Sequence, residues 1–340
     1  MKKIMAILLV LIMLIPVTAC GQTNEKKGVD STVSEVQYPV TVTDHAGRTV
    51  VIEKKPERFV SCYYITSSLL IALGLDEKTV GIENNPEYRP IYALSAPAML
   101  ELPWIGTAKS VDLEACATLA PDLAILPMKV KDSADDLEAL GIKVLLVNPE
   151  SQELLIEMIS MVAKVTDTEA RGNELIEYIN SKENYLIELL RGEDTPRVYI
   201  AGNSNFLSTA GSAMYQSDMI CLAGGMNVAA EIEDTYWAEI DYEQLLAWNP
   251  EYIILPSSAK YTVEDIVADP VLAGCQAIVN GNVYQIPGNA ESWDSPVPGS
   301  FLGAFWLTTI LHPDLLTETE CNEVMDEYYE KFYAFTYSEN

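Results

Sequence analysis

The 340-residue chain is short of histidine and of the sequence motifs that mark enzymes. His45 and His312 are the only histidines, which excludes a naked zinc or manganese site built on several imidazoles. Histidine ligation of haem is also not expected, although a tyrosine could take that place. No GxSxG, GxGxxG or phosphate-loop pattern occurs. We therefore expect no enzyme activity, no catalytic residues, no resident cofactor and no metal site built by the protein.

Basic residues are scarce, above all in the second half of the chain. From residue 195 onward there are only Arg197, Lys260 and Lys331. The formal net charge is −29, and loss of residues 1–19, which hold two lysines and no acid, would make it −31. A surface this acidic repels nucleic acid, so we expect no nucleic-acid partner.

Long apolar runs are absent beyond the N-terminus. The run from Ile4 to Ile15 follows two lysines; it is shorter than the about 20 residues of a membrane span and typical of a signal peptide. Val17-Thr18-Ala19-Cys20 resembles the lipobox of bacterial lipoproteins, whose cysteine is diacylated. We expect a signal peptide over 1–19, lipidation of Cys20 and a polar tether over 20–36, which would anchor an extracytoplasmic protein to the bacterial cell membrane.

Five cysteines remain after Cys20, an odd number without CxxC spacing, which gives no support to a zinc or iron–sulfur site. These cysteines could form one or two disulfides, or they could be buried as small apolar side chains; the sequence allows both. The five are Cys62, Cys116, Cys221, Cys275 and Cys321.

An internal repeat gives the architecture. Residues 111–127 read VDLEACATLAPDLAILP and residues 240–256 read IDYEQLLAWNPEYIILP, with six identical positions at an offset of 129. In each copy an aspartate is a good helix N-cap, and a glutamate lies in the first helical turn. The helix must end before the proline, and the apolar run that follows predicts a strand buried on both faces. Two such units predict two similar α/β lobes.

The rest of the chain fits this α/β class. We expect two Rossmann-like lobes with mainly parallel sheets, over residues 37–165 (the first lobe) and 193–340 (the second lobe). Between them, 166–192 contains no proline and has apolar residues at helical intervals, which predicts one long interlobe helix. Expected strands are Val40–Thr43, Val50–Glu53, Phe59–Cys62, Thr79–Ile82, Leu123–Leu126, Val144–Val147, Arg197–Ala201, Tyr252–Leu255 and Val283–Ile286, the first two forming a hairpin.

Several further motifs, in this order, resemble one family over roughly residues 38–335: DHAGRTVVIEKKPERFVS, ALGIKV, LAGGMNV, IDYEQLLAWNPEYIIL, GNVYQIP and LHPD. They are similar to the class III substrate-binding proteins of ABC importers, which serve ferric siderophores, haem and cobalamin. The resemblance implies a monomer that holds a small-molecule solute between its lobes. It also implies that Glu114 and Glu243 meet arginines of the permease transmembrane subunits. The alternative role, stabilising helix N-termini, is worth about 0.3–1 kcal/mol each.

Side chains at the carboxyl ends of parallel strands are the candidates for ligand binding. The first lobe offers Tyr63, Tyr64, Thr66, Ser67, Asn85, Arg89, Trp104 and Lys129. The second lobe offers Asn203, Tyr215, Tyr236, Trp237, Ser257, Lys260 and Trp293.

The aromatic and hydroxyl content of this set favours a bulky metal chelate such as a ferric siderophore, cobalamin or haem. The small number of lysine and arginine residues favours a chelate that carries little charge. The alternative is an oxyanion such as molybdate or tungstate, held by hydroxyls and helix N-termini, with Thr66-Ser67-Ser68 opposite Ser257-Ser258. A structural or adhesive lipoprotein is the alternative of a different class, but it would not need matched glutamates on two lobes.

Overall fold

Four parallel strands form the frame of the first lobe. The computed structural model describes residues 37–233 and 237–340, so the expected signal peptide, Cys20 and the whole of the expected tether lie outside the described residues. The sheet has the order β4-β3-β7-β8. Its strands are β3 (Phe59–Ser61), β4 (Thr79–Gly81), β7 (Leu123–Pro127) and β8 (Lys143–Val147), each where the sequence predicts one.

The second lobe repeats this arrangement. Its parallel sheet has the order β11-β9-β13-β14. The strands are β9 (Arg197–Ile200), β11 (Met226–Asn227), β13 (Tyr252–Leu255) and β14 (Val283–Gln285). The edge strand β11 was not predicted, because two residues are too few to show a periodicity.

Three two-stranded antiparallel ribbons complete the strands of the described chain. The expected hairpin pairs β1 (Val40–Thr43) with β2 (Thr49–Ile52). The other two ribbons were not predicted and connect larger elements. They are β5 (Gly106–Thr107) with β6 (Ser110–Val111), and β10 (Ser208–Ala210) with β12 (Trp237–Glu239).

Both faces of each sheet are covered by helices, as the buried strands require. On β7, Leu123 and Ile125 face a core that also holds α1 and α5, whereas Ala124 and Leu126 face a core with α3 and α4. In the first lobe the helices are α1 (Tyr64–Ala72), α2 (Pro90–Ser95), α3 (Leu113–Leu119), α4 (Ala134–Ala139) and α5 (Gln152–Thr166).

In the second lobe, Ile253 and Leu255 of β13 face α8, α9 and α10, and Ile254 faces the opposite side with α7 and α11. The helices are α7 (Tyr215–Leu222), α8 (Tyr242–Trp248), α9 (Val263–Val267), α10 (Gln276–Asn280), α11 (Phe301–Leu311) and α12 (Glu318–Tyr333). Short 3-10 helices occupy Asp76–Lys78, Pro86–Tyr88, Pro97–Glu101, Met128–Ser133 and Tyr337–Glu339.

The repeated unit has the same caps in both copies. Asp112 accepts a hydrogen bond from the backbone N–H of Ala115 at 2.9 Å, and Asp241 accepts the equivalent bond from Gln244 at 2.8 Å. Each helix is followed by a residue in the left-handed conformation with φ of 45°: Ala120 after α3 and Asn249 after α8. The sequence echo is therefore a structural repeat of helix, left-handed turn and strand.

One long helix occupies the stretch between the lobes. It is α6 (Glu169–Leu189), 21 residues or about 32 Å long. It begins later than residue 166 because Asp167, with φ of 58°, ends α5 in a left-handed turn.

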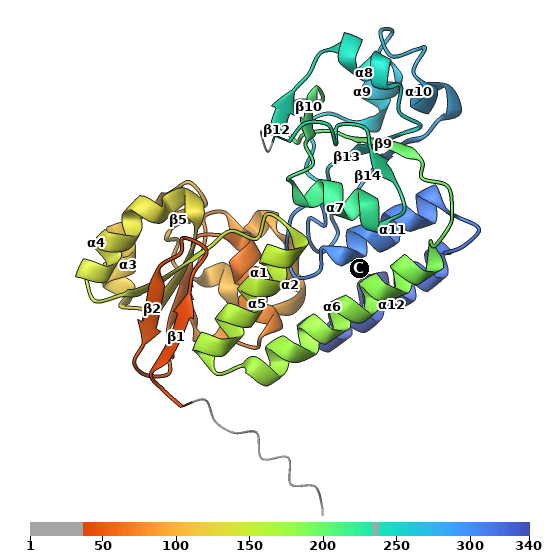
Figure 1. The fold of residues 1–340 in the computed structure, drawn as a ribbon. Coiled ribbons are helices and arrows are strands. Elements are labelled where there is room, and N and C mark those ends of the chain that lie inside the picture. Colours follow the sequence, from red (N-terminus) through yellow and green to blue (C-terminus); the bar gives the residue numbers. More distant parts are fainter. Residues whose placement is uncertain (1–36, 234–236) are drawn as a thin grey trace, which may run out of the picture. The chain divides into compact units, whose positions relative to one another are not determined.

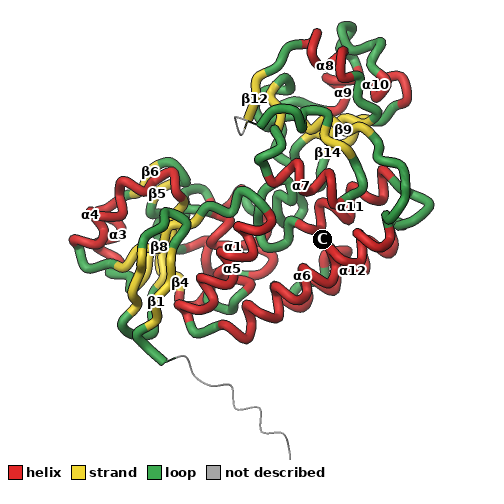
Figure 2. The backbone as a smooth tube through the Cα atoms, viewed as in Figure 1, coloured by secondary structure: helices red, strands yellow, loops and turns green. Residues whose placement is uncertain are grey.

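The C-terminal helix α12 runs beside α6, as Figures 1 and 2 show. Lys182 of α6 pairs with Glu327 of α12 at 2.7 Å. At its far end α12 contacts the first lobe, where the Ser95 hydroxyl donates to the backbone carbonyl of Tyr333 at 2.6 Å. Two helices, rather than one, thus connect the halves.

A single hydrophobic core links the two sheets. It includes Phe59 and Leu123 of the first sheet together with Val198 and Ile254 of the second. Side chains of α6, α11 and α12 fill the space between them. Consistent with this packing, residues 35–340 form one compact unit.

The five cysteines of the described chain are free thiols, and four of them are buried. Within the described ranges, no helix combines the length and the apolar character needed to cross a bilayer.

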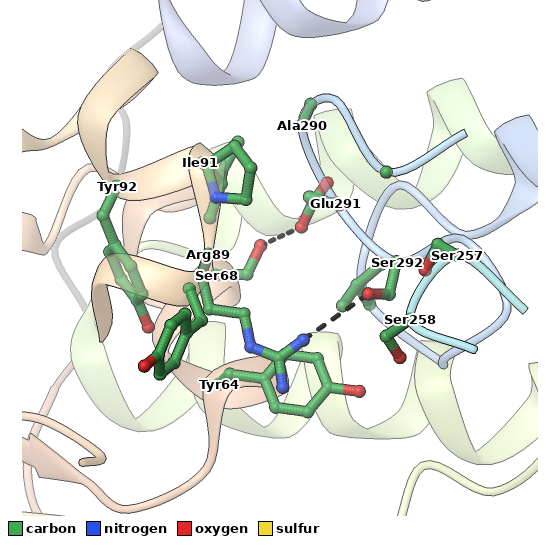
Figure 3. A pocket seen from close by; sticks show the side chains of 14 residues that line it. Tyr64, Ser68, Arg89, Ile91, Tyr92, Ser257, Ser258, Ala290, Glu291 and Ser292 are labelled. Carbon is green, nitrogen blue, oxygen red and sulfur yellow. Dashed lines mark hydrogen bonds between the residues drawn. The ribbon is translucent and has the colours of Figure 1, made fainter. Parts of the chain in front are cut away.

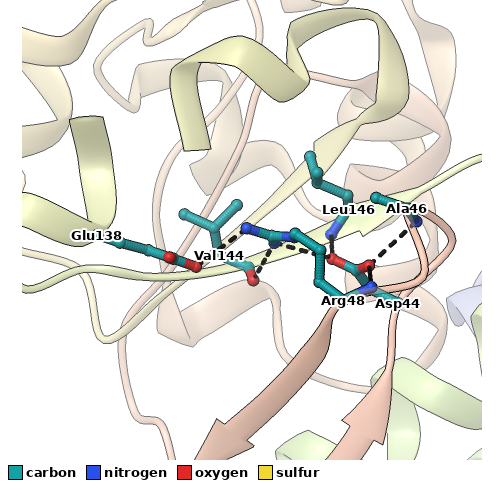
Figure 4. Close-up of polar contacts among 6 residues, drawn as sticks. All are labelled: Asp44, Ala46, Arg48, Glu138, Val144 and Leu146. Carbon is teal, nitrogen blue, oxygen red and sulfur yellow. Dashed lines mark hydrogen bonds and ion pairs between the residues drawn. The ribbon is translucent and has the colours of Figure 1, made fainter. Parts of the chain in front are cut away.

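A buried aspartate fastens the N-terminal hairpin to the edge of the first sheet (Figure 4). Asp44, 3 % exposed, accepts backbone N–H bonds from Ala46, Arg48 and Leu146 at 2.9–3.2 Å. The Arg48 guanidinium pairs with the Asp44 carboxylate at 2.8 Å, bonds the Val144 carbonyl and reaches the half-exposed Glu138 at 3.1 Å. This cluster, called here the Asp44 clamp, provides hydrogen-bond partners for Val144 and Leu146 at the edge of β8 that has no neighbouring strand.

We expect Asp44→Ala to lower the free energy of unfolding by about 3–4 kcal/mol, because it leaves buried N–H groups and a half-buried guanidinium without their acceptor. Glu138→Gln, which removes only the exposed partner of Arg48, should cost less than about 0.5 kcal/mol. Urea denaturation of both variants checks this, and equal losses would contradict the clamp.

Candidate ligand-binding site

A cavity of about 140 Å³ lies between residues of both lobes. The first lobe contributes the start of α1 and the segment from Tyr88 to Tyr92, and the second contributes the segments that follow β13 and β14. Seven hydroxyl groups line it, those of Tyr64, Ser68, Tyr88, Tyr92, Ser257, Ser258 and Ser292 (Figure 3). Ile91, Ala290 and Val297 add apolar surface. The walls are therefore rich in hydroxyl groups, although those of Ser68, Tyr92, Ser257 and Ser258 donate to acceptors within the protein.

Arg89 is the one cation of the described chain among the lining residues. Its guanidinium carbon lies 3.8 Å from the centre of the Tyr64 ring, and Nη1 lies 3.5 Å from the Ser292 hydroxyl. Burial raises the pKa of Tyr64 to about 12, with Arg89 opposing that rise, so the phenol remains neutral. The stacked guanidinium thus presents its positive charge beside several neutral donors.

A buried carboxyl group, Glu291, forms part of the cavity wall. Its Oε1 accepts a hydrogen bond from Ser68 on α1, and its Oε2 accepts one from Tyr329 on α12 at 3.2 Å. Burial raises the pKa of Glu291 to about 7, and the bonds from Ser68 and Tyr329 oppose that rise. The contact joins first-lobe and second-lobe residues directly behind the cavity.

Two more buried acids lie next to the cavity. Glu83 follows β4 and accepts hydroxyl bonds from Ser67, at 2.7 Å, and Tyr92. Asp294 accepts a bond from Ser257 at 2.9 Å. Burial raises the pKa of both carboxyl groups, with the hydroxyl bonds opposing the shift. Each acid is held by hydroxyl donors rather than by a salt bridge.

Three of the predicted binding residues, Tyr64, Arg89 and Ser257, line the cavity. Others lie directly behind it. The Tyr63 ring packs edge-on against Tyr64 at 5.8 Å, and Asn203 accepts a bond from the lining residue Ser258 at 2.9 Å.

The remaining predicted residues do not line the cavity. Thr66 and Ser67 are buried in α1, Tyr215 is buried at the start of α7, and Trp293 is buried with its Nε1 donating to Tyr329 at 2.9 Å. Exposed or partly exposed positions belong to Asn85, Trp104, Lys129, Trp237 and Lys260. Tyr236 lies outside the described residues.

Sequence reasoning missed Glu83 and Tyr88, and it named Ser68 only within the alternative oxyanion site. A signal for Glu83 exists, because it lies two residues beyond the end of β4, where the strand-end rule looks for binding residues. Tyr88 gives no such signal: its side chain is 78 % exposed although it lines the cavity. The segment 291–295 is polar and follows a strand, which points to Glu291 without showing that its carboxyl is buried.

The candidate docking glutamates are exposed on equivalent helices. Glu114 lies in the first turn of α3 and Glu243 in the first turn of α8. No ion pair is found for either carboxylate within the described chain.

Two α/β lobes with a small polar cavity between them define a bilobed binding protein. The family model for periplasmic binding proteins matches residues 60–290, and the chain belongs to that family. This confirms the family resemblance and the fold class that the sequence predicts.

Curated relatives differ in the solute that they are named for. The molybdate-binding protein MolA of Haemophilus influenzae is 25% identical over 89% of this chain and 90% of its own length. The ABC transporter substrate-binding lipoprotein YvrC of Bacillus subtilis is 25% identical over 75% of this chain and 80% of its own. The vitamin B12-binding protein of Salmonella typhimurium is 23% identical over 59% of this chain and 73% of its own.

Solved structures share the fold. MolA bound to molybdate superposes with a TM-score of 0.78 at 24% identity, covering 87% of this chain and 98% of MolA. CeuE of Helicobacter pylori with Ni(II) bound gives a TM-score of 0.75 at 19% identity, covering 86% of this chain and 96% of CeuE. These likenesses show the fold and leave the solute to the site.

The buried acid makes stability depend on pH. Because the pKa of Glu291 is about 7 in the folded protein and about 4.3 in an unfolded chain, the unfolded state loses its proton first as pH rises. The free energy of unfolding therefore falls between these values and stays reduced above about pH 7. Glu291→Gln, which cannot ionise, should be more stable than the wild type at pH 8 by about 1–3 kcal/mol.

At about pH 4 that advantage should nearly vanish, because the folded wild type is then protonated and the unfolded chain is mostly protonated as well. Chemical denaturation at the two pH values measures it. An advantage of equal size at both would show that Glu291 is not protonated by burial.

Proposed function

We propose that this protein is the solute-binding component of an ABC importer and that it captures a tetrahedral oxyanion of the molybdate and tungstate class. In this proposal a lipid on Cys20 anchors it outside the cytoplasm, and it works as a monomer. The observation that carries the choice of ligand is the small, donor-rich cavity around Arg89.

Cavity size favours a small ligand. A cavity of about 140 Å³ is smaller than the clefts of about 300–1,000 Å³ that hold drug-sized ligands. A tetrahedral oxyanion fits such a space, and a corrinoid, haem or siderophore does not unless the walls move apart.

The chemistry of the walls also favours an oxyanion. Arg89 supplies one fixed positive charge, and the hydroxyls of Ser257, Ser258 and Ser292 come from two separate segments of the second lobe. To bind the oxyanion, Ser257 and Ser258 would turn their hydroxyl hydrogens away from Asp294 and Asn203. Charge-assisted hydrogen bonds to an anionic oxygen are about twice as strong as neutral ones. One guanidinium and several hydroxyls can surround an oxyanion without neutralising it fully.

Relatives support the same choice. MolA, a molybdate-binding protein by name, matches this chain over nearly its whole length. The vitamin B12-binding relatives match a smaller part of it.

A metal chelate is the second candidate, which the exposed aromatic side chains favour. Tyr88 is 78 % exposed at the cavity and Trp237 is 37 % exposed on β12. Such rings could stack on a macrocycle if the lobes separated. Binding of cyanocobalamin rather than molybdate would select this alternative.

We expect Arg89→Gln to weaken molybdate binding about 30-fold, because it removes the one charge-assisted donor of the cavity. Lys129→Gln removes a cation that is exposed and outside the cavity, and it should leave the affinity within about twofold. Calorimetric titration with molybdate, tungstate and cyanocobalamin measures both. Equal affinity of the two variants for molybdate would contradict the oxyanion site.

We propose that Glu114 and Glu243 dock the protein on the permease. Each lies exposed in the first turn of a helix of the repeated unit, which presents the same carboxylate once on each lobe. The double variant Glu114→Ala/Glu243→Ala should bind solute normally and lose uptake of labelled molybdate in cells that carry no other copy.

A matched control separates docking from helix stabilisation. Glu153 and Glu264 are also exposed acids in first helical turns, on α5 and α9. The variant Glu153→Ala/Glu264→Ala loses the same interaction with helix dipoles and should retain uptake. Loss of uptake in both variants, or in neither, would contradict the docking role.

A further inference from the structure

We propose that Glu291 is a specificity-determining residue of the cavity, and that it takes up one proton from solvent when a dianion binds beside it. This rests on the proposed function, since it assigns a role in oxyanion binding to a residue that would otherwise repel the ligand.

At Oε2 of Glu291, the direction of the hydrogen bond with Tyr329 is fixed. The indole Nε1–H of Trp293 can only donate, and it donates to the Tyr329 oxygen at 2.9 Å. Tyr329 must therefore use its own hydrogen toward Oε2 of Glu291, at 3.2 Å. Oε2 is an acceptor in either protonation state.

The other end can reverse. Oε1 of Glu291 shares a short hydrogen bond with the Ser68 hydroxyl, which also lies 2.8 Å from the Tyr333 hydroxyl. With Glu291 ionised, Ser68 donates to Oε1 and Tyr333 donates to Ser68. With Glu291 protonated, Oε1 donates to Ser68, Ser68 donates to Tyr333, and Tyr333 turns to the Ser68 backbone carbonyl at 3.4 Å. The hydroxyl hydrogens of Ser68, Tyr329 and Tyr333 each have an acceptor in both arrangements.

The charged and titratable groups around Glu291 leave it without a counter-charge. From α12 it faces the phenols of Tyr328, Tyr329 and Tyr333, and from α1 it faces Ser68. Asp294 lies on its own segment, and Arg89 is stacked on Tyr64 across the cavity. No salt bridge to Glu291 exists within the described chain, and burial already brings its pKa to about 7.

A dianion in this cavity adds negative charge beside the carboxyl, which raises the pKa further. The proton then lies on Oε1, comes from the buffer and returns to it when the ligand leaves. A neutral ligand would leave Glu291 as it is. The protein thereby accepts a dianion beside a single guanidinium, because the proton cancels the negative charge of the carboxylate that would otherwise repel the ligand.

Calorimetric titration of the purified protein with molybdate, between about pH 6.5 and about pH 8.5 and in two buffers of different ionisation enthalpy, tests this. Molybdate stays a dianion over this range. Above about pH 7 the wild-type dissociation constant should rise up to about tenfold per pH unit, with about one proton taken up per molybdate at pH 8. Glu291→Gln mimics the protonated form, and its affinity should be independent of pH and of buffer.

Glu183→Gln is the matched control. Glu183 is a partly buried acid on α6 whose pKa burial also raises to about 7, but it does not line the cavity. This variant should keep the wild-type pH dependence.

The outcomes separate the two proposals. Molybdate binding with a constant affinity and no proton uptake in the wild type overturns the role of Glu291 and leaves the oxyanion site standing. So does a Glu291→Gln variant that keeps the wild-type pH dependence. If neither protein binds molybdate or tungstate at any pH, the oxyanion function fails and the role of Glu291 with it. The proton uptake of the wild type decides the matter even if the variant does not fold.

Discussion

The hydrophobic core that runs from one sheet to the other is the constraint on which the site depends. Because Phe59 of the first lobe and Ile254 of the second belong to one core that side chains of α6, α11 and α12 continue, apolar packing as well as chain connection joins the lobes. The helices α6 and α12 reinforce this packing through Lys182 and Glu327. A cavity between lobes held in this way has nearly preformed walls, so little binding energy is spent on ordering them.

Three carboxyl groups are buried at or next to the cavity, and their burial is unfavourable for stability. Glu83, Glu291 and Asp294 are at most 7 % exposed, and each is satisfied by hydroxyl groups without a salt bridge. Burying a carboxyl favours its neutral form by several kcal/mol in apolar surroundings. A set of acids kept in these positions is difficult to explain by stability alone, since apolar residues of similar volume would pack there without that cost.

The fold could be predicted from the sequence because its signals are local and repeated. Apolar runs such as Leu123–Leu126 locate the buried strands, and the aspartate caps define both copies of the repeated unit. The two-residue strand β11 and the ribbon of β10 with β12 could not be predicted, because their pairing depends on tertiary contacts. For the site, the strand-end rule nominated Tyr64 and Ser257, which line the cavity. The rule cannot distinguish side chains that face the cavity from those that are buried in the core, and it therefore also nominated residues that do not line it. Trp293 was predicted to contact the ligand, whereas it is buried and donates its Nε1–H to Tyr329 of α12.

The small number of lysine and arginine residues does not by itself exclude an anionic ligand. From the sequence, scarcity of lysine and arginine argues for a weakly charged ligand, because each anionic charge normally requires a basic partner. The cavity shows that hydroxyl groups and a carboxyl that can hold a proton line the same space as the single guanidinium. Protons are a source of positive charge that no count of basic residues includes. A chain with a net charge of −29 can therefore bind a dianion if its local hydrogen-bond network, rather than its overall field, determines the affinity.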